Sequence, residues 1–117
     1  MAAVIKNDLG KIIINEDLIA SIAGYATGEN YGIVAMSNKD ATDAFLKLVG
    51  SDNVKRGVKI TVTEQDHVRI DLYVTLMYGV SLPAVANNVI SNVKYRVEEF
   101  TGLKVDYVNI FVEAIRV

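Results

Sequence analysis

Two segments in the middle of the chain alternate apolar and polar residues with a period of two. Val58, Ile60 and Val62 alternate with polar residues, and residues 68–78 continue the same pattern. Because successive side chains of a strand point to opposite faces, this pattern predicts two strands, each with one buried face. The polar residues 64–66 between them predict a tight turn, so we expect an antiparallel hairpin.

Apolar residues recur at helical spacing in three other segments. The first follows Asn15, a residue type that caps helix N-termini, and ends near Gly28. The second covers residues 40–49, and the longest follows Ser81 and ends at Gly102. The apolar face predicted for the longest helix consists of Ala86, Val89, Ile90, Val93, Val97 and Phe100.

Short apolar runs predict further strands at residues 9–14, 31–37 and 103–117. In the last of these, the apolar phase changes from odd to even positions near Tyr107, which predicts a bulge there. The resulting order is β-α-β-α-β-β-α-β. We therefore predict a single α+β domain over residues 1–117, with a mixed β-sheet that contains an antiparallel hairpin and has helices packed on it.

The amino-acid composition argues against several classes of function. The chain has 117 residues, of which 51% are hydrophobic, and only one proline, which favours one folded domain over disorder. It has no cysteine, which excludes disulfides, thiolate metal sites and cysteine nucleophiles. Its net charge of −2 disfavours binding to nucleic acid through a positive field. We expect no cofactor, no metal and no nucleic-acid partner.

Motifs for catalysis are also missing. The pair Gly10-Lys11 lacks the other residues of a phosphate-binding loop. The single histidine, His67, has Asp66 and Asp71 near it in sequence, but it has neither a cysteine nor a second histidine to complete a metal site. A solvated strand face is therefore favoured over a catalytic or metal-binding role.

Four apolar side chains fall where the pattern predicts polar ones. Tyr73 and Met77 lie on the polar face of the hairpin, Phe111 is out of phase in the last strand, and Tyr95 interrupts the polar side of the long helix. Together they form a candidate interface with another subunit. A helix of the same chain, such as the one that contains Phe45, would also cover this face, and the sequence leaves both interpretations open.

A basic cluster comes just before and within the hairpin. It consists of Lys55, Arg56 and Lys59, and it is a candidate loop for contact with an anionic partner. A solvated loop is the favoured interpretation, because a stable electrostatic membrane anchor usually takes more charge.

By its length, the uncharged stretch of residues 72–93 could be mistaken for a membrane span of about 20 residues. It contains glycine, proline and several asparagines, whose polar groups would need partners in hydrocarbon. The N-terminus lacks the apolar segment of a secretory signal. We therefore expect a cytoplasmic protein that does not insert directly into the membrane.

Several short motifs occur here in one combination: Gly57-Val58, Ile70-Asp71-Leu72-Tyr73, Tyr78-Gly79, Thr101-Gly102-Leu103 and Val108-Asn109-Ile110. In this combination the chain resembles the alkaline-shock, or general-stress, family of bacterial envelope stress response proteins. It is most similar to the small single-domain branch found beside fatty-acid-kinase-like genes in Gram-positive bacteria.

The resemblance implies a non-enzymatic cytoplasmic scaffold or interaction protein of the envelope stress response to alkaline or cell-wall stress. Such a protein acts by self-association as a homo-oligomer and by binding a partner. The implied partner is a small membrane-anchor protein, which would hold the chain at the membrane periphery. The alternative is an accessory regulator of a fatty-acid or phospholipid metabolic enzyme. The resemblance implies no catalytic residue.

Overall fold

The computed structural model of the chain describes residues 2–36 and 57–117. The predicted helix at residues 40–49, with Phe45, lies outside this part of the chain, as do Lys55 and Arg56. The described elements are β1 (Ala3–Asn7), β2 (Gly10–Ile14), α1 (Glu16–Gly28), β3 (Ile33–Met36), β4 (Val58–Glu64), β5 (His67–Met77), α4 (Leu82–Thr101) and β6 (Lys104–Arg116).

The main sheet is built around β5, the longer of the two strands of the hairpin. On one edge β5 pairs antiparallel with β4 and, nearer its C-terminal end, with β3. On the other edge β5 pairs parallel with β6, and the connection runs through α4. The predicted hairpin and the mixed sheet of an α+β fold are both confirmed.

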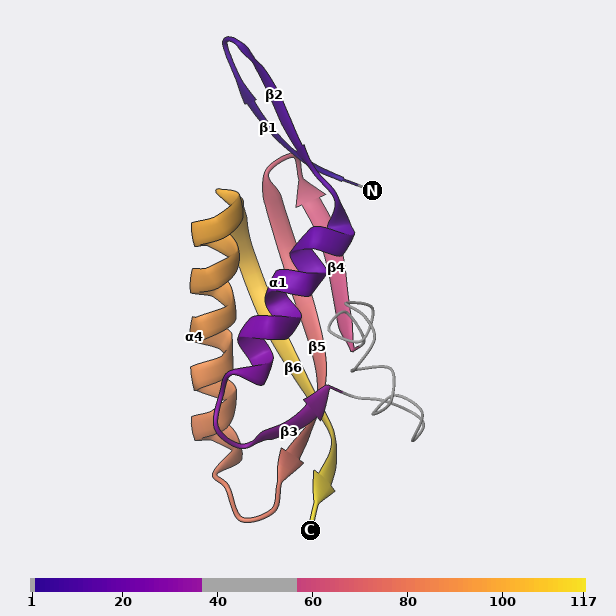
Figure 1. Cartoon of the computed structure of the whole chain (residues 1–117), viewed down its shortest axis with the longest axis vertical. Coiled ribbons are helices and arrows are strands. Elements are labelled where there is room, and N and C mark those ends of the chain that lie inside the picture. Colours follow the sequence, from indigo (N-terminus) through magenta and orange to yellow (C-terminus); the bar gives the residue numbers. More distant parts are fainter. Residues whose placement is uncertain (1, 37–56) are drawn as a thin grey trace.

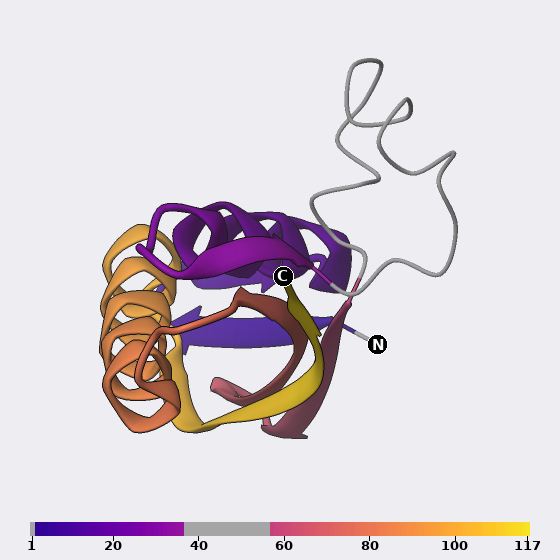
Figure 2. The same cartoon turned by 90° about the horizontal axis from the view of Figure 1, so that it is seen from below.

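Both described helices cover the same face of this sheet, as Figures 1 and 2 show from two directions. On that face β5 buries every second side chain: Val68, Ile70, Leu72, Val74 and Leu76. On the opposite side of the core, the helix α4 contributes a row of valines at a spacing of four residues: Val85, Val89, Val93 and Val97. The core therefore lies between the sheet and the two helices.

The helix ends form where capping residues predict them. The Asn15 side chain accepts a hydrogen bond from the Asp17 backbone N–H at 2.7 Å, which fixes the start of α1. Ser81 caps the start of α4. At the other end of α4, Gly102 adopts a left-handed φ of 76°, and its N–H donates to the Glu98 carbonyl at 2.9 Å.

The N-terminal part of the chain contains a strand that sequence patterning missed. The predicted strand at residues 9–14 is observed as β2, and it pairs antiparallel with β1. The turn between them forms because the Asn7 side chain accepts hydrogen bonds from the N–H groups of Leu9 and Gly10, at 2.8 and 3.0 Å. This hairpin extends beyond the helices and the main sheet (Figure 1).

The last strand contains the predicted bulge. Its pairing with β5 shifts by one residue between Val105 and Tyr107, so Asp106 is the extra residue. A second shift leaves Glu113 as an extra residue between Val112 and Ala114. Phe100, expected on the buried face of the long helix, is instead 67% exposed, because the row of valines ending at Val97 faces the sheet.

Candidate interaction surface

The face of the main sheet that points away from α1 and α4 carries the alternate side chains of its strands. We call it the open face. It consists of His67, Arg69, Asp71, Tyr73, Thr75 and Met77 on β5, Tyr107, Asn109, Phe111, Ala114 and Arg116 on β6, and Lys59 and Thr61 on β4. Within residues 2–36 and 57–117, no helix lies on this face (Figure 2).

Two aromatic rings stack at the centre of the open face. Tyr73 on β5 and Phe111 on β6 are paired in register, and their ring centroids lie 4.7 Å apart with an angle of 12° between the planes. Tyr73 is half-buried, whereas Phe111 remains 45% exposed. Stacked rings gain roughly 0.5–1.5 kcal/mol beyond the area they bury, so the pair stabilises the contact between β5 and β6. It also leaves apolar surface in water.

A polar row crosses the open face beside the stack. Asp71 is only 6% exposed, and its Oδ1 accepts a hydrogen bond from Asn109 Nδ2 at 2.9 Å. Arg69 Nε lies 3.8 Å from Asp71 Oδ2, and this buried nitrogen makes no hydrogen bond to the residues that the structure describes. Lys59 is paired opposite Asp71 on β4. The buried carboxylate is therefore held by an amide and a guanidinium.

The edge of the open face near the hairpin turn holds the single histidine. His67 Nδ1 lies 2.8 Å from Asp106 Oδ1, and Thr63 Oγ1 donates to Asp106 Oδ2 at 3.1 Å. The hydrogen bond to Asp106 raises the pKa of His67 above its ordinary value, and the same bond lowers the pKa of Asp106. Asp106 reaches this position because it is the bulged residue of β6.

This arrangement does not pair His67 with the Thr63 hydroxyl. The carboxylate of Asp106 lies between Thr63 and the imidazole, so His67 has no contact through which it would take the hydroxyl proton. Asp66, which the sequence brings near His67, is 3.6 Å from its Nε2. No group of three or more metal-binding side chains occurs in the described segments.

The structure separates the residues that were predicted to form one interface. Tyr73, Phe111 and Met77 share the open face, and Met77 is 40% exposed. Tyr95 is 61% exposed but belongs to α4, in the helical layer on the other side of the sheet. Of the predicted basic loop, only Lys59 is described, and it is an exposed residue of the strand β4.

Sequence reasoning missed several exposed apolar residues. Tyr107 on the open face is 65% exposed, because the bulge at Asp106 turns its side chain away from the core. The change of apolar phase that begins at Val108 is the signal that would have identified it. Leu9, Ile12 and Ile13 are also exposed, on the N-terminal hairpin. They escaped notice because a run of isoleucines normally predicts a buried strand.

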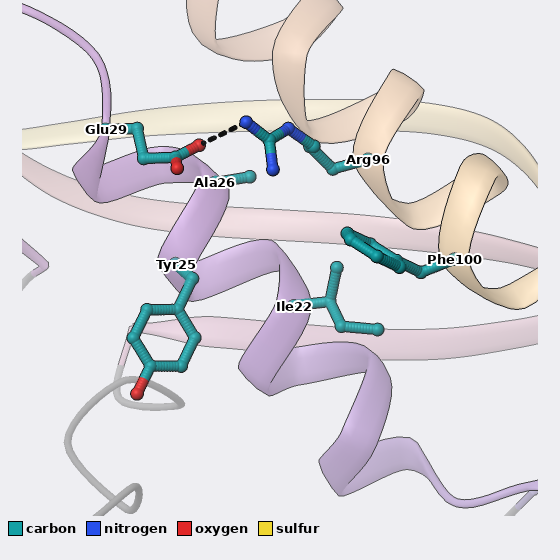
Figure 3. A pocket seen from close by; sticks show the side chains of 6 residues that line it. All are labelled: Ile22, Tyr25, Ala26, Glu29, Arg96 and Phe100. Atoms are coloured by element: carbon teal, nitrogen blue, oxygen red, sulfur yellow. Dashed lines mark ion pairs between the residues drawn. The ribbon is translucent and has the colours of Figure 1, made fainter.

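A second surface lies between the two helices on the side away from the sheet. It is a hollow of about 130 Å³, and Figure 3 shows its lining residues: Ile22, Tyr25, Ala26, Glu29, Arg96 and Phe100. Arg96 and Glu29 form an ion pair of 3.2 Å at one end, and Phe100 and Ile22 lie toward the other. Sites for small molecules usually enclose about 300 Å³ or more, so this hollow is small for such a ligand.

Comparison with known proteins identifies the family of the chain. The model of the alkaline shock protein family, described as having a cell envelope-related function, matches residues 4–117. The chain belongs to the alkaline shock protein family. The resemblance drawn from its short motifs is thereby confirmed. No solved structure matches the chain.

Relatives of this alkaline-shock-family chain occur in Bacillus subtilis and Streptococcus pyogenes. "Uncharacterized protein YloU" of Bacillus subtilis is 37% identical over all of this chain and 98% of its own length. "Uncharacterized protein Spy1614" of Streptococcus pyogenes is 34% identical over 92% of this chain and 89% of its own. "Uncharacterized protein YqhY" of Bacillus subtilis is 33% identical, over 92% and 78%.

The family description concerns the cell envelope, which raises the question of a membrane span. Among the described residues, no helix is long and apolar enough to cross a membrane. The helix α4 covers 20 residues, but it contains Lys94, Arg96, Glu98 and Glu99.

Proposed function

We propose that this alkaline-shock-family chain is a non-enzymatic interaction protein that acts in the bacterial envelope stress response by self-association and by binding a partner. The observation that carries the proposal is the open face, where the Tyr73–Phe111 stack and Tyr107 present aromatic surface to solvent. Exposed aromatic side chains gathered on one face of a small domain are typical of an interaction site.

The polar contacts of the open face support the same conclusion. The carboxylates of Asp71 and Asp106 are already bound to side chains of the same sheet, at 2.9 Å to Asn109 and 2.8 Å to His67. Such contacts hold neighbouring strands together, which gives both carboxylates a structural role in the sheet. We therefore propose that this surface recognises another protein.

The family supports a proposal for the place of action. We propose that the chain works in the cytoplasm and is held at the membrane periphery through a small membrane-anchor protein. Support comes from the cell envelope-related function of the family. Fractionation of cells with and without the anchor would test this: the chain should leave the membrane fraction when the anchor is missing, and unchanged association would contradict the proposal.

Self-association is tested by light scattering over micromolar concentrations. We expect a mass above that of the monomer for the wild type and a lower mass for Phe111→Ser. The matched control is Tyr95→Ser, which removes an exposed aromatic ring from the helical layer and should leave the mass unchanged. A wild type that stays monomeric at every concentration would refute the proposal.

The alternative, an accessory regulator of a fatty-acid or phospholipid enzyme, predicts a closed apolar pocket between helix and sheet. In the described part of the fold, that space is filled by Val89, Val93 and Val97 against β5. The hollow at Phe100 lies between the helices and is open to solvent. These observations favour the interaction protein.

A further inference from the structure

The strand β6 ends the main sheet on one side. It is 13 residues long, and among the described strands it pairs only with β5. At its start, the outward N–H of Val105 is bound by the Glu98 carboxylate of α4 at 3.0 Å. Past this point, residues 107–112 continue as a strand whose second edge meets no other described strand. Unpaired backbone groups on such an edge form a template for another strand.

The composition of this segment is unusual for a free edge. Residues 107–112 read Tyr-Val-Asn-Ile-Phe-Val and contain neither a charge nor a proline. Proteins normally protect edges with charges, prolines or bulges, and here the two bulges, at Asp106 and Glu113, lie just outside the segment. A sequence rich in β-formers and free of charge pairs readily with its own kind. The segment is therefore suited to a partner strand.

The segment is also complementary to itself. Tyr107, Asn109 and Phe111 lie on the open face, and Val108 and Ile110 lie on the core face. Paired residues of an antiparallel ladder share a face, so a two-fold axis through Asn109 is compatible with both faces. That axis places Tyr107 opposite Phe111 of the second copy, and Val108 opposite Ile110 of the second copy. Aromatic residues therefore pair on the open face, and aliphatic residues pair on the core face.

This register lengthens the aromatic stack. Tyr73 is paired with Phe111, and Tyr107 is paired with Arg69, within each chain. Across the axis, the row consists of Tyr73 and Phe111 of one copy, followed by Tyr107 and Arg69 of the second copy. The guanidinium of Arg69 therefore lies next to the last aromatic ring of the row.

We propose that residues 107–112 of β6 pair antiparallel with the same residues of a second copy, with Asn109 at the two-fold axis. The two main sheets then join into one continuous sheet through the β6 edge of each copy, and a two-fold contact of this kind closes as a dimer. The proposal rests on the proposed function, because it names the surface through which self-association occurs. Pairing of one strand buries less than a standard interface of about 800 Å² per partner, so we expect association on the order of micromolar.

The absence of cysteine from the sequence allows a direct test of this register. In Asn109→Cys, the two thiols face each other across the axis at a Cα distance of about 4.5–5.5 Å, within the range that a disulfide bridges. Mild oxidation should give at least about tenfold more covalent dimer than in the control Tyr95→Cys, whose exposed side chain is in the helical layer.

A mixture of two variants tests the register more sharply. Tyr107→Cys and Phe111→Cys should form a disulfide with each other when mixed, and each alone should form little, because the identical positions lie far apart across the axis. Circular dichroism confirms that each variant is folded.

The two proposals fail differently. If the wild type self-associates but Asn109→Cys gives no more covalent dimer than Tyr95→Cys, edge pairing is overturned and the proposed function stands. If the wild type is monomeric at all concentrations, both are overturned.

Discussion

Gly32 lies in the turn between α1 and β3, where the chain passes close to the start of α4. Its φ is +95°, in the left-handed region that residues with a Cβ rarely adopt. A Cβ added at Gly32 would lie 2.8 Å from Cγ2 of Val85, a buried residue of α4. The substitution Gly32→Ala therefore combines backbone strain with a steric clash.

The size of each contribution follows from the structure. The left-handed backbone costs an alanine about 1–2 kcal/mol. Forcing an extra methyl group into packed surroundings costs about 1–3 kcal/mol more. Gly79 supplies a matched control, because its φ is +93° but no atom lies within 4 Å of its added Cβ. We expect Gly79→Ala to lose about 1–2 kcal/mol and Gly32→Ala to lose about 2–5 kcal/mol.

The assay is urea unfolding followed by circular dichroism, which gives the free energy of unfolding of each variant. A third variant, Gly32→Ala with Val85→Ala, makes room for the new methyl group. Its loss should be smaller than the sum of the two single losses by about 1 kcal/mol or more. Equal losses for Gly32→Ala and Gly79→Ala, within about 0.3 kcal/mol, would refute the clash with Val85.

Four further predictions concern the open face and the first helix. The raised pKa of His67 should fall toward its ordinary 6.5 in Asp106→Asn, which NMR can follow without ambiguity because the chain has one histidine; no change would contradict the pairing. The pair of His67 and Asp106 should stabilise the fold fully between about pH 3.8 and 6.5. This stabilisation should decline at lower pH, as Asp106 is protonated below its lowered pKa, and at higher pH, as His67 is deprotonated above its raised pKa. If Asp106→Asn left the pH dependence of the free energy of unfolding unchanged, this contribution of the pair would be excluded. A double-mutant cycle of Tyr73→Leu and Phe111→Leu should give a coupling of about 0.5–1.5 kcal/mol in unfolding experiments, and additive losses would mean that the rings do not interact. Replacing the cap residue in Asn15→Ala should cost about 1 kcal/mol, and a change below about 0.2 kcal/mol would show that the cap is not needed.

Local features of the chain were predictable because their causes are local. The alternation over residues 68–78 is enough to define a strand with one buried face, and Asn15, Ser81 and Gly102 mark helix ends through hydrogen bonds to neighbouring residues. The change of phase near Tyr107 located a bulge for the same reason. The strand β1 escaped because its short apolar run is followed at once by polar residues, and its pairing with β2 depends on the turn at Asn7.

The candidate site could be predicted only in part. Tyr73, Met77 and Phe111 were recognised because apolar side chains on a polar face break the expected period. Tyr95 is also an apolar side chain on a polar face, but it does not lie on the open face. A helix and a strand on opposite sides of one core present their polar faces in opposite directions. Sequence spacing alone carries no information on which layer an exposed residue joins.

The sequence by itself determined the family, the α+β class and the positions of most strands and helices. Only the tertiary structure decided which side chains meet: Tyr73 with Phe111, and His67 with Asp106. These contacts exist because β6 returns beside β5 in a defined parallel register after crossing through α4. The physical reason is that periodicity reports the environment of a residue, whereas its neighbours across a sheet depend on which strands pair and in what register.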